Sequence, residues 1–198
     1  ELKKARANTK QWEDQLAQIK STQASSMLQL NRSNRFNELE LAAKLYEEAY
    51  YLKKENPTVT SIWWLISASD AYTANSNFKL AESTLKEINI VCAKQADLQK
   101  LDLEWERCLS ISHMKLGYLL EKNEGWLKAL GHFEIARQIS EKLLKIDENN
   151  LRFQQDLSIV YELIGYAKLQ INELDLAFNS YQKTKQIIYR FLFINRMH

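Results

Sequence analysis

The sequence repeats itself at a step of 48 residues, and this repeat limits the possible folds more than any other feature. Residues 109–118 align with residues 157–166, and the alignment places Gly117 opposite Gly165. The same step pairs other residues of similar size: Trp105 with Phe153, Ala129 with Ala177, and Phe133 with Tyr181. Such a period is typical of chains that stack copies of one small unit, since one copy cannot bury its apolar face alone.

A third, more diverged copy precedes these two. It matches its successor at four positions: Tyr72 with Leu120, Phe78 with Trp126, Ala81 with Ala129, and Leu85 with Phe133. We therefore predict units at 57–104, 105–152 and 153–198. Part of the pattern occurs once more, at Leu39, Ala42, Tyr46 and Ala49. This predicts a degenerate unit that ends at residue 56, so that the repeat domain covers 33–198.

Each unit is expected to form two antiparallel helices joined by a tight turn. In the middle unit, His113, Leu116 and Leu120 fall within about 60° of one another at 100° per residue, which predicts a first helix. Turn-forming residues follow at 122–125. The second helix is predicted from a run of large and small residues at helical spacing: Trp126, Ala129, Phe133, Ala136 and Ile139. With 4 Gly and 1 Pro in 198 residues, few positions would interrupt helices.

These spacings resemble the tetratricopeptide repeat (TPR) family. Its pattern of bulky, Leu-Gly, bulky, aromatic, Ala, aromatic and Ala is met by His113, Leu116, Gly117, Leu120, Trp126, Ala129, Phe133 and Ala136. Other units depart from it, with Ser69 in place of the glycine and with Lys168 and Thr184 at a bulky and a small position. The resemblance implies an all-α fold, an α-solenoid of antiparallel helix hairpins. The step exceeds the usual of about 34 residues, which implies longer helices like those in bacterial multi-domain signalling and defence proteins.

Residues 1–32 differ from the repeat domain in composition. Trp12, Leu16, Ile19 and Met27 are spaced among polar residues, which predicts a polar helix with a thin apolar stripe. We interpret it as a linker that packs lightly on the first hairpin, with a coiled-coil contact to a partner as the alternative. The chain starts at Glu1 rather than Met, so we expect either an excised fragment or a processed product of a longer protein.

Composition and motifs exclude several classes of function. The net charge is +2, from 27 Lys and Arg against 25 Asp and Glu, which gives little attraction for nucleic acid or anionic lipid. The sequence lacks an apolar run of about 18 residues and lacks phosphate-loop, dinucleotide, zinc-hydrolase and serine-elbow motifs. Cys92 and Cys108 have no metal-ligand spacing and are read as reduced thiols. We therefore expect a cytoplasmic, non-enzymatic protein without a cofactor, a metal or a membrane span.

The remaining reactive and charged residues have structural interpretations. Cys108 and His113 point about 140° apart on a helix, too far for a thiolate and its base, and His113 occupies a packing position of the repeat. His132 and His198 are expected to stand alone. The basic residues Lys183 and Lys185 lie among aromatics, as in RNA-binding proteins, but these aromatics also fit a core stripe.

The resemblance also suggests where a partner would bind, because the first helix of each TPR hairpin lines the concave surface. The expected partner-binding residues are Trp63, Ile66, Asp70, Met114, Tyr118, Glu121, Glu162, Tyr166 and Leu169. Ile111 and Ile159 belong to the same helix faces. The alternative is that these faces pack on the adjacent hairpin. Since Asp70, Tyr118 and Tyr166 occupy places where some TPR proteins grip a terminal carboxylate with Lys, Arg or Asn, a ligand with apolar anchors is expected instead.

We therefore predict a protein-interaction scaffold that holds a partner protein or peptide on its concave face. The alternative is a regulatory or oligomerising sensor segment of a larger bacterial signalling or defence protein, with an NTPase or protease effector. One further feature favours self-association. The C-terminal helix is crowded with large apolar residues at Ile187, Ile188, Phe191, Leu192, Phe193 and Ile194, and a terminal repeat needs a polar outer face to remain soluble.

Overall fold

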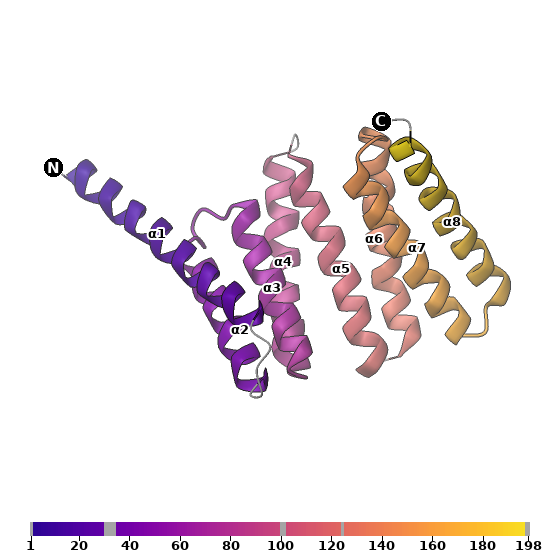
Figure 1. Cartoon of the computed structure of the whole chain (residues 1–198), viewed down its shortest axis with the longest axis horizontal. Coiled ribbons are helices and arrows are strands. Elements are labelled where there is room, and N and C mark those ends of the chain that lie inside the picture. Colours follow the sequence, from indigo (N-terminus) through magenta and orange to yellow (C-terminus); the bar gives the residue numbers. More distant parts are fainter. Residues whose placement is uncertain (1, 30–34, 100–101, 124, 197–198) are drawn as a thin grey trace. The chain divides into compact units, whose positions relative to one another are not determined.

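The computed structural model describes residues 2–29, 35–99, 102–123 and 125–196, and all the regular structure in these ranges is helical (Figure 1). The helices are α1 (Leu2–Gln29), α2 (Arg35–Tyr51), α3 (Val59–Ala74), α4 (Phe78–Leu98), α5 (Leu103–Asn123), α6 (Trp126–Ile146), α7 (Leu151–Gln170) and α8 (Leu174–Arg196). The chain divides into two compact units, Glu1–Ile88 and Asn89–His198, and the division falls within α4. The predicted boundary at residue 32 lies outside the described residues.

Local interactions explain where several helices begin. Thr58 caps α3, because its hydroxyl accepts a hydrogen bond from the Ser61 amide (3.1 Å) and its own amide donates to the Ser61 hydroxyl (2.9 Å). Asn150 caps α7 by accepting hydrogen bonds from the amides of Arg152 and Phe153. Each cap pairs backbone donors that the first helical turn leaves without a partner.

The turns inside the hairpins follow the repeat as well. Ser76 lies between α3 and α4 with φ 58°, and Asn172 lies between α7 and α8 with φ 64°. They are 96 residues apart, which is twice the repeat step. Both adopt the left-handed conformation that reverses the chain after a helix, and a short polar side chain tolerates it. These two turns therefore share the same backbone geometry at this position.

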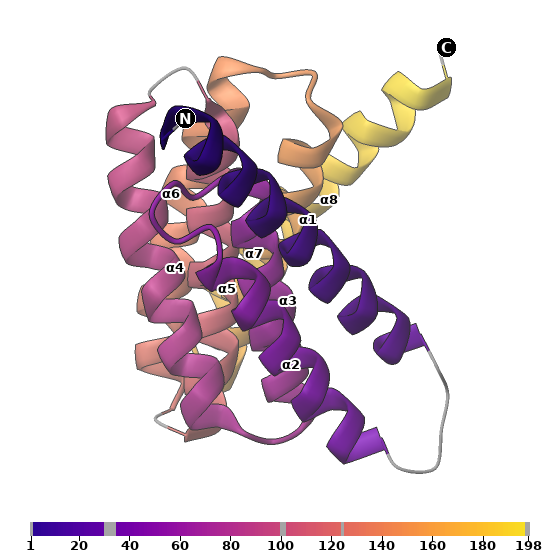
Figure 2. The same ribbon diagram turned by 90° about the vertical axis from the view of Figure 1, so that its left-hand side faces the viewer.

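In the first unit, α1 packs against α2 and α2 packs against α3. Figure 2 shows α1 and α2 side by side. Small residues at Ala17, Ser21 and Ala24 are buried, while Lys20 of α1 forms an ion pair with Glu48 of α2 (2.6 Å). Small side chains allow the two helices to approach closely.

Glu47 of α2 joins three helices of this unit. Its carboxylate accepts hydrogen bonds from the Tyr72 hydroxyl of α3 (2.8 Å) and the Thr84 hydroxyl of α4 (3.1 Å). Burial and the adjacent Glu47 carboxylate raise the pKa of Tyr72, so the phenol stays protonated and donates. A single carboxylate thus fixes the spacing of α2, α3 and the first half of α4.

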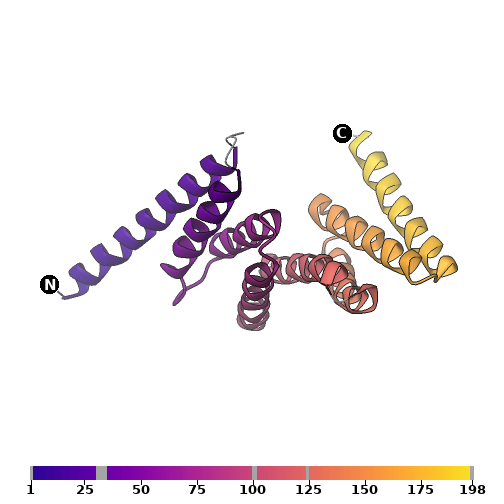
Figure 3. The same cartoon turned by 90° about the horizontal axis from the view of Figure 1, so that it is seen from below.

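In the second unit, α5 packs on α6, α6 on α7, and α7 on α8. Figure 3 shows the α7–α8 hairpin with its short turn. The repeated glycines lie where the two helices of each hairpin meet. A Cβ atom at Gly117 would collide with the ring of Phe133, and one at Gly165 would lie 3.0 Å from the ring of Tyr181. The prediction of an all-α fold built from antiparallel helix hairpins is confirmed.

The glycine contact predicts an order of stability among alanine variants. Gly117→Ala should lower the free energy of unfolding by about 1 to 3 kcal/mol, because the new methyl group displaces the buried Phe133 ring. Gly131→Ala is the matched control, since Gly131 is an exposed glycine in α6 and a Cβ atom added there would meet no other atom within 4 Å. It should stabilise by about 0.5 to 1 kcal/mol through helix propensity. Urea unfolding followed by circular dichroism measures the free energy of unfolding of both variants. Equal changes in the two variants would contradict the close contact between Gly117 and Phe133.

Candidate partner-binding surface

The residues expected to bind a partner lie on the first helices of three hairpins. Trp63, Ile66 and Asp70 belong to α3, Met114, Tyr118 and Glu121 to α5, and Glu162, Tyr166 and Leu169 to α7. The α3 residues are in the first unit and the others in the second, so they form two separate candidate regions.

In the first unit, Asp70 alone of the three expected residues is exposed. Ile66 is buried and Trp63 is half-buried, so both contribute to packing. Asp70 lies at a pocket of about 220 Å³ between α1, α2 and α3. The other lining residues are mostly apolar: Met27, Leu28, Glu38, Leu39, Ala71 and Ala74. Most of the α3 face that was expected to bind a partner therefore packs against the rest of the protein.

In the second unit, one side of α7 is exposed along most of its length. Ile159, Tyr166 and Leu169 are each 40 to 44% exposed, and Glu162 between them is also exposed. At 100° per residue these four positions fall within about 80° of one another, so they form a continuous stripe. This stripe is an apolar surface that contains one carboxylate.

The corresponding side of α5 becomes exposed only toward its C-terminal end. Ile111 and Met114 are buried, whereas Tyr118 is 44% exposed and Glu121 is half-buried. Helices α5 and α7 are in contact. We call the exposed residues of these two helices, together with the half-buried Glu121, the α5–α7 surface; it consists of Tyr118, Glu121, Ile159, Glu162, Tyr166 and Leu169.

Polar contacts hold α7 in place beside α5 and α6. The Arg107 guanidinium of α5 donates to the Asp156 carboxylate of α7 (2.7 Å), and both side chains are largely buried. The Tyr161 hydroxyl donates to Glu141 of α6, and burial followed by this carboxylate raises the pKa of Tyr161 to about 12. Since the groups that make these contacts come from different helices, they fix how α7 presents its exposed side.

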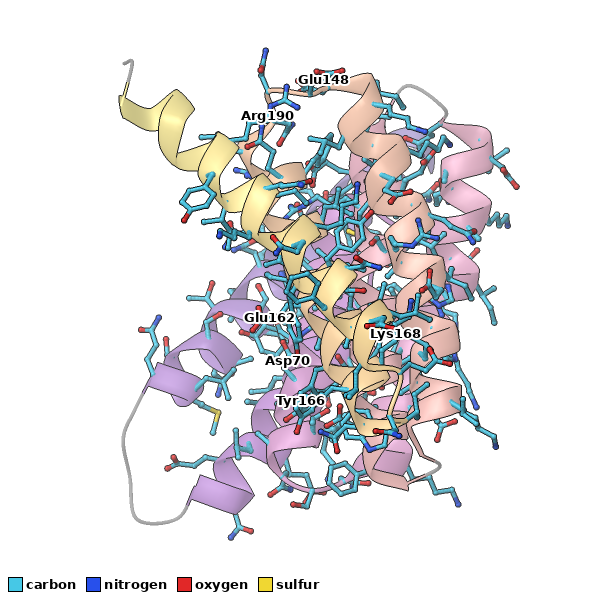
Figure 4. The ribbon with its side chains drawn as sticks, turned by 90° about the vertical axis from the view of Figure 1, so that its right-hand side faces the viewer. Asp70, Glu148, Glu162, Tyr166, Lys168 and Arg190 are labelled. Carbon is cyan, nitrogen blue, oxygen red and sulfur yellow. The ribbon has the colours of Figure 1, made fainter. Side chains whose placement is uncertain are left out.

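Tyr166 is supported from behind by a second aromatic ring. The Trp126 ring of α6 meets it edge to face, with centroids 5.1 Å apart and planes at 83°. Figure 4 shows Glu162 and Tyr166 on one side of α8 and Lys168 on the other. The Lys168 ammonium lies 3.9 Å from the Glu134 carboxylate of α6. The Tyr166 ring is therefore pre-positioned yet still 44% exposed.

The histidine prediction is partly wrong. His113 lies in the α5–α6 seam, as its packing position indicates, but His132 is not isolated. The two rings stack with centroids 5.2 Å apart, and their Nδ1 atoms are 2.9 Å apart. The pairing of Gly117 with Phe133 could have indicated this contact, because His113 lies one turn from Gly117 and His132 is directly beside Phe133 in the sequence. Among the described residues, no group of three or more His, Cys, Asp or Glu could hold a metal ion.

The two cysteines lie in the core of the second unit. Cys92 and Cys108 are both free and buried. The neighbouring Cys108 side chain, followed by burial, raises the pKa of the Cys92 thiol, so it remains protonated and a poor nucleophile. Within the described ranges, no helix is long and apolar enough to cross a membrane.

Comparisons with known proteins return only distant structural similarity. No protein-family model matches the sequence, and no curated protein matches it. A crystal structure of MamA is similar over 84% of this chain and 85% of its own, with 16% identity and a TM-score of 0.39. A structure described as MamA MSR-1 C2 is similar over 79% of this chain and 95% of its own, with 16% identity and a TM-score of 0.32.

The histidine pair predicts how stability depends on pH. Burial and the neighbouring His132 lower the pKa of His113 from 6.5 to about 4 in the folded protein. Between these two values the unfolded chain binds a proton that the folded chain does not, so stability should fall as the pH drops from 6.5 toward 4. Above pH 6.5 the histidine pair should not change how the free energy of unfolding depends on pH.

The matched variant is His113→Leu. Leucine is the residue at the equivalent position of the preceding unit, Leu65. Its melting temperature should fall less between pH 6.5 and pH 4.5 than that of the unchanged protein, as measured by circular dichroism. If the melting temperatures of the two proteins fell by the same amount over this pH range, the predicted effect of His113 on stability would be refuted.

Proposed function

We propose that this chain is a non-catalytic scaffold that binds a partner protein or peptide through the α5–α7 surface. One observation carries the proposal: Tyr118 and Tyr166, 48 residues apart, are both 44% exposed at the same place in successive hairpins. The repeat thus keeps a large aromatic ring half-exposed twice, while the seam residues beside it are buried. Aromatic side chains of this kind supply much of the affinity in protein interfaces.

The chemistry of the surface suggests the kind of partner. It offers apolar and aromatic side chains, with the carboxylates of Glu121 and Glu162 beside them. A helix or an extended segment with apolar anchors would fit it, and a basic residue in that segment would complement the two carboxylates. The terminal carboxylate of a partner would not fit this surface, because no lysine or arginine belongs to it. The proposal includes a cytoplasmic location, where Cys92 and Cys108 would stay reduced.

A second candidate function is oligomerisation or regulation within a larger bacterial signalling or defence protein. The observation that favours it is the exposed apolar area of α8, which includes Leu174, Phe178 and Tyr189 at about 60% exposure each. The side chains of Phe191, Leu192, Phe193 and Ile194, on which the sequence-based expectation of self-association partly rests, lie outside the described side chains. Soluble proteins seldom leave so much apolar area uncovered on one helix.

The binding proposal predicts a selective loss of partner capture. Replacing both tyrosines, Tyr118→Ala with Tyr166→Ala, should weaken capture at least tenfold, because two anchors are lost and each factor of ten needs only about 1.4 kcal/mol. The melting temperature should fall only a few degrees, through loss of the Trp126 contact.

Chemical crosslinking to partners in a lysate, quantified by mass spectrometry, provides the measurement. Tyr51→Ala is the control, since Tyr51 is a 48% exposed tyrosine on α2 and belongs to the first unit. Equal capture by the double variant and the control would disprove the proposed surface. A large loss of stability in the double variant would show that the two rings serve packing instead.

A further inference from the structure

A carboxylate and two tyrosine rings lie together where α7 meets α8. Glu162 and Tyr166 are one turn apart on α7 and about 40° apart around its axis, and Figure 4 shows them on the same side of α8. The ring of Tyr181, on α8, packs on α7 at Gly165, the residue before Tyr166. All three side chains are exposed, the two tyrosines at 44% and 36%. We call Glu162, Tyr166 and Tyr181 the α7–α8 cluster.

The negative charge of Glu162 acts on the Tyr181 ring. Burial raises the pKa of the Tyr181 phenol, and the Glu162 carboxylate and then Tyr166 raise it further. A carboxylate disfavours a phenolate in this way only when the two groups are close, which agrees with the packing of Tyr181 on α7. The Tyr166 ring is held in turn by its edge-to-face contact with Trp126. The cluster therefore presents two neutral aromatic rings beside one carboxylate.

Glu162 carries a charge that the protein does not balance. Helix α7 has two acidic residues, and the other, Asp156, pairs with an arginine of α5 (2.7 Å). Within the described ranges, no cationic side chain forms an ion pair with Glu162. Lys168 of α7 lies 3.9 Å from a glutamate of α6, and the Lys185 ammonium of α8 lies 5.6 Å from the centroid of the Tyr189 ring. The Glu162 carboxylate is thus accessible to a cation from another molecule.

The repeat shows that this polar character is a property of the last hairpin. One step of 48 residues earlier, the three equivalent positions hold Met114, Tyr118 and Phe133. Met114 and Phe133 are buried, so the middle hairpin exposes only the tyrosine. In the last hairpin, Glu162 and Tyr181 replace them and are both exposed. The third copy therefore keeps the exposed tyrosine and adds a carboxylate and a phenol around it.

This combination suits a guanidinium group better than an ammonium group. A guanidinium is planar, so it can lie flat against an aromatic ring while its edge donates two parallel N–H bonds to a carboxylate. An aromatic face also attracts a cation through its electron-rich centre. An ammonium would keep the attraction but lose the stacking and the paired hydrogen bonds, and it is more strongly hydrated.

We propose that the α7–α8 cluster binds an arginine side chain of the segment held by the α5–α7 surface. The guanidinium would donate to the Glu162 carboxylate and stack on a tyrosine ring. Ile159 precedes Glu162 by three residues and Leu169 follows Tyr166 by three, so the residues on either side of the arginine should be apolar. This inference rests on the partner-binding function proposed above and names the polar anchor of that partner.

A pair of matched peptides tests the inference. The probe is acetyl-Leu-Ala-Arg-Ala-Leu-amide, in which an extended conformation places both leucines and the arginine on one side. The comparison peptide carries citrulline, which has nearly the same shape as arginine but no charge. Titration followed by NMR of the tyrosine ring protons measures both dissociation constants. The arginine peptide should bind about fivefold more tightly than the citrulline peptide, and a lysine peptide should fall between them.

Glu162→Gln should reduce the preference for arginine over citrulline to about twofold or less, because only the aromatic rings would still favour the cation. Glu148→Gln is the matched control: Glu148 is an exposed glutamate that Figure 4 shows at the opposite end of the hairpin from Tyr166. The control should keep the full preference.

Equal binding of the arginine and citrulline peptides, binding of neither, or equal effects of the two variants would overturn the inference. The partner-binding function is tested separately by capture from a lysate. If the variant lacking both Tyr118 and Tyr166 still lost capture, that function would stand without an arginine anchor.

Discussion

The contact between an aromatic ring on the second helix and a glycine on the first controls the geometry of each hairpin in the second unit. Phe133 is buried against Gly117, and the Tyr181 ring packs against Gly165. The absence of a Cβ atom lets the ring reach the helix backbone, and this sets the distance and the rotation of the two helices. Once these are fixed, the side of α5 and α7 that carries Tyr118 and Tyr166 is turned away from the seam.

The first unit solves the same packing problem with different residues. Ser69 occupies the glycine position and Leu85 the aromatic position, and both are buried. Serine is larger than glycine and leucine is smaller than an aromatic residue, so the summed side-chain volume of the two positions changes little. The Ser69 hydroxyl donates to the Ile66 carbonyl oxygen of its own helix (2.7 Å), so it is buried without losing a hydrogen bond. The copies have thus diverged as compensating pairs.

Periodicity predicts which side of a helix carries apolar residues, and in this chain it predicted the helices and the seam between them. It does not predict how much of that side a neighbouring helix covers. Ile66 and Met114 share a pattern with Tyr118, yet both are buried while Tyr118 is half-exposed. The difference comes from packing between hairpins, which depends on residues far away in the sequence. The same limit explains why the partner of His113 was not predicted from a single helix.

Polar contacts between hairpins decide how one repeat is attached to the next, and local sequence rules do not detect them. The Glu47 contact with Tyr72 spans 25 residues, and the Arg107 contact with Asp156 spans 49. Each joins helices from successive hairpins and can be identified only after the helices are placed. In α8 the acceptors at two such positions are lost, since Gln182 and Tyr189 stand where α6 has Glu134 and Glu141. Helix α8 therefore lacks the two carboxylates with which α6 contacts Lys168 and Tyr161 of α7.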